Sequence, residues 1–416
     1  MNTFILLILI LIFGFISFHF INQKLQDKFL YFTGLEYLFL GILIGAPFLN
    51  WINSNFELDF PILLSPESSL QLKPIIALII GTVGFTTGLK LRFKDYSDLN
   101  RERLRLALTD VVFTTLILFL FFFGIFRYFF TNLLSFDEAL VNALVLGTSA
   151  STYSPSVLQT LKNKFHIEGP NYNSLLFNSS ISNIISIVLF GMLFSIVHQG
   201  VPKNLDITIT EWFMINIAIG IVIGILFFIF LEREENENKL LLALMGIIIF
   251  TSGVAYYLNF STLFISLIMG IFIANTSKVY KRIESTLEKL EHPFYVIILI
   301  YAGSILNVTD WAIWSAGLVL YLILRMNIKN FNGWFAYQAS YDKTAFSPTI
   351  GKGLNSQGMI AIAMALNFIQ VYENDLSITI FGVIIAAVIV NEFLSIKWTR
   401  DVLIDLNEIS PMKKES

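Results

Sequence analysis

Long apolar stretches recur along the whole 416-residue sequence, and no other feature limits the fold as strongly. Each stretch approaches the roughly 17 to 25 apolar residues that a helix needs to cross a membrane. Charged residues make up only 14% of the chain, whereas soluble proteins usually contain about 25%. The sequence therefore predicts an all-α, multi-pass integral membrane protein surrounded by membrane lipid. Thirteen spans are expected, at residues 3–20, 30–51, 73–89, 106–126, 138–160, 172–197, 211–231, 239–257, 260–276, 292–308, 311–334, 346–370 and 376–398.

The basic residues test this count, because the cytoplasmic loops of membrane proteins retain Lys and Arg. Alternate loops on one side contain twenty-two of the 27 basic residues, whereas the loops on the other side contain only Lys73, Arg127 and Lys203. This asymmetry predicts that the N-terminus lies outside and the C-terminus in the cytoplasm. We expect the protein in the cell (inner) membrane.

Several classes of function are disfavoured by composition. The connections between spans are too short for a soluble domain, so we expect one transmembrane domain over 1–402 and a short cytoplasmic tail over 403–416. The chain has no cysteine, and its four His residues form no metal-binding pattern, so neither a metal site, a cofactor nor an enzyme is predicted. A net charge of −3 with scattered basic residues gives no surface for nucleic acid.

The fifth span, 138–160, does not look like a continuous helix. Its central stretch GTSASTYSPS, Gly147 to Ser156, combines one Gly and one Pro with seven hydroxyl-bearing side chains. Pro155 removes a backbone donor and disfavours helical geometry at Ser154. We predict an interruption near the middle of the membrane. Irregular backbone at that depth must be buried in protein or line an aqueous cavity, so Thr152 and Ser154 are candidate binding residues.

The twelfth span, 346–370, supplies a partner for this interruption. Its first half contains Asn355 and Gln357 among glycines and serines, which are poor residues for a helix interior, and an apolar helix follows. Secondary transporters place interrupted helices at corresponding positions of two repeats, with the ends of the half-helices at the binding site. An alternative is a cytoplasmic loop that leads into an ordinary span.

Two basic residues fall inside the eleventh span, 311–334. Arg325 lies about halfway along it, where a charge costs roughly 2.5 kcal/mol or more to insert, so it should face a cavity or a partner. Lys329 lies one turn further on, and we expect it to extend to the cytoplasmic surface without a functional role.

The order of these segments resembles the sodium/proton exchangers of the monovalent cation:proton antiporter superfamily over nearly the full length. GLEYLFLGILIGAPFL looks like the second span of that family, IIGTVGFTTGLKLRFKDY like its third, and LVLGTSASTYSPSVLQTLKN and GLNSQGMIAIAMAL like its two crossing helices. The resemblance implies an inverted-repeat fold with two crossed discontinuous helices, spans five and twelve. It also implies a homodimer that works by alternating access, with a transport core including about 73–198 and 292–370 and the remainder forming the scaffold and dimer interface.

The sixth span, 172–197, departs from that family at its ion-binding acids. The resemblance places Ser182 and Asn183 at the family's Asn-Asp or Asp-Asp pair, Asn178 at an acidic position five residues earlier, and Gln357 at an Arg. It retains Arg325 as the basic residue of a later span. An amide cannot take up and release a proton at physiological pH. We expect the polar half of this span to face the interruption in span five.

Three hypotheses for function therefore remain open. The first is exchange of a monovalent cation, Na⁺ or K⁺, for protons, with Asp110 of the fourth span as the candidate proton-carrying carboxylate and Glu36 and Glu392 as weaker candidates. A structural role for each of these acids is the alternative. The second is a carrier of the same fold for an organic anion or other solute, because Arg325 beside hydroxyls and amides suits an anion. The third is a transport-inactive scaffold or sensor.

Overall fold

The computed structural model describes residues 5, 8, 12, 14, 34–62, 64–96, 101–131, 134–165, 167, 169–197, 207–231, 236–308, 310–344 and 346–409, and the regular structure in these ranges is helical. The helices are α3 (Leu35–Ile44), α4 (Ala46–Phe56), α5 (Pro66–Leu89), η2 (Phe93–Tyr96), α6 (Arg101–Phe129), α7 (Phe136–Ser151), α8 (Ser156–Phe165), α9 (Pro170–Val197), α10 (Ile209–Leu231), α11 (Glu237–Tyr257), α12 (Thr262–Thr276), α13 (Tyr280–Ser304), α14 (Trp311–Ala339), η3 (Ile350–Asn355), α15 (Met359–Val371) and α16 (Asp375–Asp405).

Within the described ranges, seven helices are long and apolar enough to cross a membrane: α5, α6, α9, α10, α11, α14 and α16. Shorter apolar helices are α12, α15 and the second half of α13. The prediction of an all-α membrane protein is confirmed, whereas the count of thirteen spans stays a prediction. The first predicted span, 3–20, lies largely outside the described residues. So do residues 410–416 of the predicted tail, whose first residues belong to α16.

The second predicted span, 30–51, is divided into α3 and α4 at Gly45. This residue has extended backbone geometry, and Pro47 follows in the first turn of α4, where its missing N–H costs nothing. A Cβ at Gly45 would lie 2.4 Å from the carbonyl oxygen of Ser304. The glycine therefore lets the end of α13 approach the division closely.

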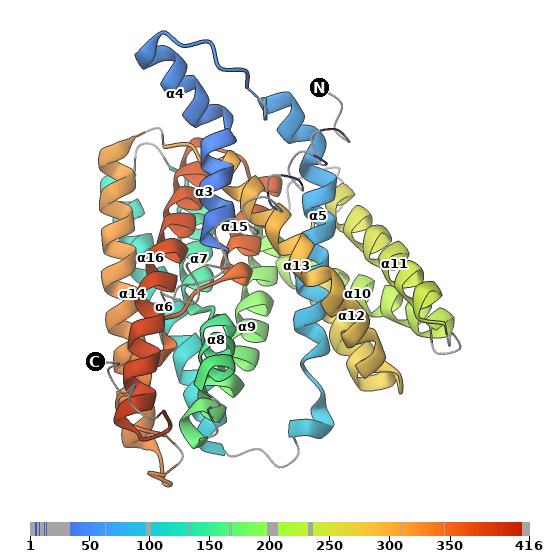
Figure 1. The fold of residues 1–416 in the computed structure, drawn as a ribbon, viewed down its shortest axis with the longest axis vertical. Helices are drawn as coiled ribbons and strands as arrows, with labels where there is room; N and C mark the ends of the chain where they lie inside the picture. The colour runs from blue at the N-terminus through green and yellow to red at the C-terminus, as the bar shows by residue number, and fades with distance from the viewer. Residues whose placement is uncertain are drawn as a thin grey trace, which may run out of the picture.

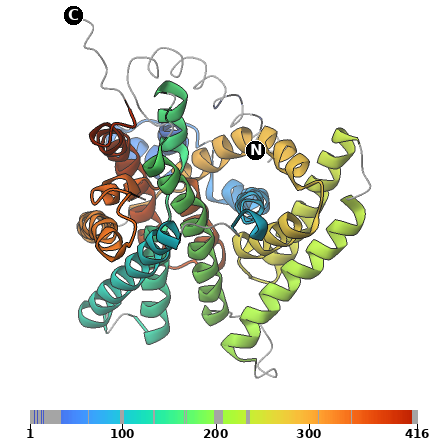
Figure 2. The same cartoon turned by 90° about the horizontal axis from the view of Figure 1, so that it is seen from below.

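The helices pack in two groups (Figures 1 and 2). One contains α6, α7, α9, α14, η3 and α16, and the other contains α5, α10, α11 and α12. In the second group α5 packs on α12, where a Cβ at Gly84 or Gly88 would lie within 2.3 Å of a carbonyl oxygen of α12. Helix α15 contacts α5 and α12 of one group and α7 and α16 of the other, so it lies where the groups meet.

Candidate functional site

An interruption divides the fifth predicted span at Thr152–Pro155. Helix α7 ends at Ser151 and α8 begins at Ser156, with Thr152 in extended geometry and Pro155 directly before α8. Gly147 is not part of the interruption, because it lies inside α7. A Cβ there would lie 2.7 Å from the carbonyl oxygen of Thr115, so this glycine allows α6 to pack closely on α7.

Asn183 of α9 forms hydrogen bonds with the backbone of this interruption. Its Oδ1 accepts a hydrogen bond from the backbone N–H of Tyr153 at 3.0 Å, and its Nδ2 donates to the backbone oxygen of Tyr153 at 2.8 Å. One turn further on, the hydroxyl of Ser186 lies 2.7 Å from that of Ser151. The polar half of α9 thus faces the interruption, as predicted, and Asn183 satisfies backbone groups that would otherwise be buried without partners.

A second interruption, at Ser356–Gly358, separates η3 from α15. The backbone N–H of Ser154 donates to the backbone oxygen of Ser356 at 3.3 Å, so the two interruptions are in direct contact. Gln357 donates through Nε2 to the backbone oxygen of Ser149 at 2.9 Å, and its Oε1 accepts from Asn391 at 2.9 Å. Gln357 therefore ties the second interruption to α7 and α16.

Asn355 ends η3, and its Nδ2 donates back to the backbone oxygen of Gly351 at 3.2 Å. The side chain is fully buried. That the two interrupted segments cross, as the family resemblance implies, stays a prediction.

Arg325 of α14 connects the two interruptions. Its guanidinium is fully buried and donates to four backbone oxygens, those of Ala150, Thr152, Asn355 and Ser356, at 2.7 to 3.2 Å. Carbonyl groups at helix C-termini carry partial negative charge, so the ends of α7 and η3 stabilise the cation. Four of the five guanidinium N–H donors are occupied in this way. Arg325 is therefore compensated by backbone and is not displayed as an anion-binding group.

Lys329 does not extend to the surface, so that prediction is wrong. It is fully buried, and its Nζ lies 2.8 Å from Oδ2 of Asp110, which is also fully buried. Lys329 also donates to the backbone oxygen of Ser151 at 3.1 Å. The Asp110 carboxylate and the end of α7 supply the negative charge and the hydrogen-bond acceptors that a buried ammonium requires. Two opposite charges inside separate spans were a signal that could have predicted this pair.

Amide and hydroxyl groups surround the Asp110 carboxylate. Asn178 of α9 donates to its Oδ2 at 3.2 Å, and the hydroxyl of Thr114 donates to its Oδ1 at 3.4 Å. Ser182 donates in turn to Oδ1 of Asn178 at 3.3 Å. Of the predicted binding residues, Asn178 and Ser182 thus gather at Asp110, whereas Thr152, Ser154, Asn183 and Arg325 gather at the interruptions.

Glu392 of α16 lies on the other side of the interruptions. Its side chain is fully buried, and its Oε1 accepts a hydrogen bond from the hydroxyl of Ser356 at 3.1 Å. The sequence placed this acid within a span but gave no sign of its partners, because Ser356 lies 36 residues away.

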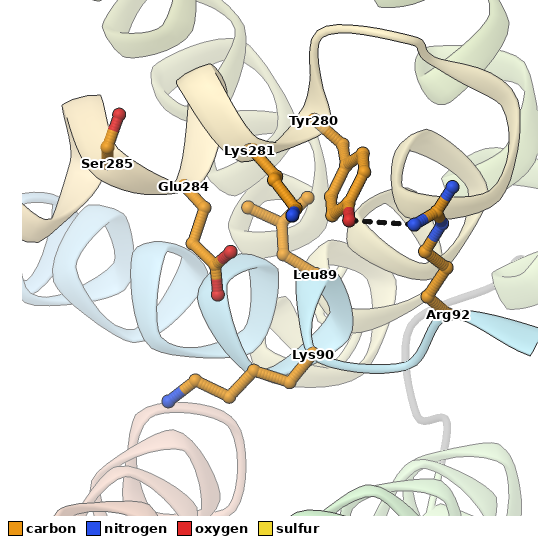
Figure 3. Close-up of a pocket in the computed structure, with 7 residues that line it drawn as sticks. All are labelled: Leu89, Lys90, Arg92, Tyr280, Lys281, Glu284 and Ser285. Carbon is orange, nitrogen blue, oxygen red and sulfur yellow. Dashed lines mark hydrogen bonds between the residues drawn. The ribbon is translucent and has the colours of Figure 1, made fainter. Parts of the chain in front are cut away.

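A cavity of about 390 Å³ reaches the interruptions from the side of α5. Threonines of α5 form one wall, and Tyr153, Ser154 and Gly358 form another. A separate pocket of about 490 Å³ lies where α5 ends and α13 begins (Figure 3). There Arg92 donates to the hydroxyl of Tyr280 at 2.8 Å. None of the residues that line this second pocket belongs to an interruption, so the first cavity is the one that serves the candidate site.

Two interrupted helices in contact inside an all-helical membrane fold are an arrangement found in many secondary transporters. The family model for the transmembrane part of sodium/hydrogen exchangers matches residues 4–398, so the chain belongs to the sodium/hydrogen exchanger family.

Solved structures agree with this fold. The sodium proton antiporter MjNhaP1 from Methanocaldococcus jannaschii at pH 8 is similar at a TM-score of 0.66 and 15% identity, over 97% of this chain and 98% of that one. An electron-microscopy structure of MjNhaP1 gives a TM-score of 0.63 and 16% identity, over 98% of both chains. A search of curated proteins finds no match.

Proposed function

We propose that this protein exchanges a monovalent cation, Na⁺ or K⁺, for protons by alternating access at the two interruptions. The contact between Ser154 and Ser356 carries the proposal, because it places two non-helical segments together at the end of a cavity that hydroxyl groups partly line. Arg325 fixes both segments to α14, so they can move as one unit. Membership of the exchanger family supports the same reaction.

The neutral residues of α9 place one condition on this proposal. Asn183 uses both ends of its amide on the backbone of Tyr153, and neither it nor Ser182 can exchange a proton. Proton coupling therefore requires a carboxylate elsewhere in the core. Asp110 is one proposed carrier, although its ion pair with Lys329 favours a structural role.

The organic-anion carrier is less favoured. The hypothesis depended on an uncompensated Arg325, and that guanidinium is occupied by four backbone oxygens. The scaffold hypothesis is less favoured because a structural protein gains nothing from a cavity that reaches non-helical backbone in the protein interior.

We further propose that the protein works as a homodimer in the cell membrane, with its C-terminus in the cytoplasm. In this arrangement a core including about 73–198 and 292–370 moves against the remaining helices. Packing of η3 and α6 against α14, all of which lie within this core, supports a common moving unit.

Transport is tested in proteoliposomes that contain a pH dye, with Na⁺, K⁺ or Li⁺ added outside. We expect a cation-evoked pH change that empty vesicles do not show. Arg325→Lys keeps the charge but cannot reach four carbonyl groups from a planar fork, so it should reduce the signal strongly. Asn327→Ala changes an exposed residue of the same helix and should leave the signal intact. A wild-type protein that responds to no cation would contradict the proposal.

A further inference from the structure

Glu392 occupies a position at which the two interruptions and α16 converge. The hydroxyl of Ser356 donates to its Oε1 at 3.1 Å. A Cβ built on Gly358 would lie 3.3 Å from the same oxygen and 2.5 Å from the hydroxyl of Ser154. The carboxyl group is thus in contact with residues of the second interruption and next to the first.

The hydrogen bonding of this carboxyl group is incomplete. Its Oε2 is buried and makes no standard hydrogen bond with any residue that the structure describes, and no salt bridge within those ranges includes Glu392. Asp110 differs, because both of its oxygens have partners and one is paired with Lys329. An isolated buried carboxylate is costly, so Glu392 needs either a bound proton or a bound cation to neutralise it.

The positive charge nearest in effect to Glu392 is that of Arg325, but the two form no salt bridge within the described residues. The titratable and charged groups that act on it are Arg325 of α14, Tyr153 of the first interruption and Tyr295 of α13. Arg325 directs its hydrogen bonds to backbone oxygens instead. The two phenols are neutral near physiological pH and supply no compensating positive charge.

The cavity beside α5 gives ions a route to this carboxyl group. Tyr153, Ser154 and Gly358 line the cavity, and Glu392 lies directly behind the wall that Ser154 and Gly358 form. A cation that passes the wall at Ser154 would find oxygen ligands in the hydroxyls of Ser154 and Ser356 and in the Glu392 carboxylate. Hydroxyl and carboxylate oxygens are suitable ligands for a hard cation.

We propose that Glu392 is the carboxylate at which the transported monovalent cation and a proton compete, and this inference rests on the function proposed above. In one state the carboxyl group holds the proton. In the other, the proton leaves to water in the cavity, and the carboxylate binds the cation together with Ser154 and Ser356. The acid that α9 lacks is thus supplied by α16.

The test measures proton release when NaCl or KCl is added to the purified, detergent-solubilised chain in weak buffer, alongside transport in proteoliposomes. Glu392→Gln keeps the shape and can still accept a hydrogen bond from Ser356, so the protein should remain folded. We expect this variant to lose both proton release and exchange. Glu392→Asp, which retains a carboxyl group, should keep part of both. Glu57→Gln makes the same chemical change at an exposed position and should match the wild type.

The outcomes separate this inference from the proposed function. A wild-type protein without exchange overturns both. Exchange in the wild type that persists in Glu392→Gln overturns the assignment of Glu392 alone. Loss of cation-evoked proton release in Asp110→Asn, with Glu392→Gln unaffected, would also overturn it and would assign the carrier to Asp110.

Discussion

Removing one member of the buried ion pair between Asp110 and Lys329 should strongly destabilise the protein. Both side chains are fully buried and the two charged atoms are 2.8 Å apart. Removing one member of such a pair typically costs about 3 to 5 kcal/mol, because the other charge is left without compensation. The cost of Asp110→Asn should lie near the upper limit of this range, since the Lys329 ammonium would retain only one backbone oxygen and an amide as partners. Lys329→Met should lie near the lower limit, since amide and hydroxyl donors still reach Asp110.

The double variant Asp110→Asn/Lys329→Met removes both charges and should cost clearly less than the sum of the two single changes. Unfolding in mixed detergent–SDS micelles, followed by the fluorescence of the six Trp residues, gives the free energies for this cycle. The pair Lys73–Glu373 is the matched control. Its charged atoms are also 2.8 Å apart, but the Glu373 side chain is 58% exposed, so the same cycle should give about 0 to 1 kcal/mol. Additive costs at Asp110 and Lys329 would refute the reasoning.

Two further substitutions probe the interruptions, and Gly246→Ala in α11 is the control for the first of them. Gly358→Ala would place a Cβ 2.5 Å from the Ser154 hydroxyl, so we expect a loss of about 1 to 3 kcal/mol in the same unfolding assay and weaker exchange. Gly246→Ala, with no atom within 4 Å of the new Cβ, should instead be stabilising by about 0.5 to 1 kcal/mol. Asn183→Asp removes the amide that donates to the backbone oxygen of Tyr153 and should destabilise the protein by about 1 to 3 kcal/mol. This loss should shrink in acid, where a protonated carboxyl group can donate again, and unfolding at neutral and acidic pH measures it.

Local chemistry allowed one interruption to be located from the sequence. Pro155 lacks a backbone donor and constrains the residue before it, so the end of α7 was predictable without knowledge of any neighbour. Gly147 was assigned to the same interruption, yet it lies in α7. A glycine in a membrane helix can mark either a break or a close contact, and only its neighbours distinguish the two.

The polar face of α9 lies against the interruption, as the sequence predicts. The role of Asn183, however, did not follow from the sequence. It was treated as a possible ion ligand, whereas its amide is engaged by backbone on both sides. Lys329 was given no role because its partner lies 219 residues away, in α6.

The sequence by itself determined the all-α membrane fold, the family, the interruption at Pro155 and the loss of acids from α9. These properties depend on apolar length, on the covalent chemistry of proline and on the identity of single residues. The tertiary structure decided which buried charges are compensated: Lys329 by Asp110, and Arg325 by the ends of two helices, while Glu392 receives a hydrogen bond from Ser356 but forms no salt bridge with the described residues. Compensation depends on distances of a few ångströms between helices that are far apart along the chain, and only folding sets those distances.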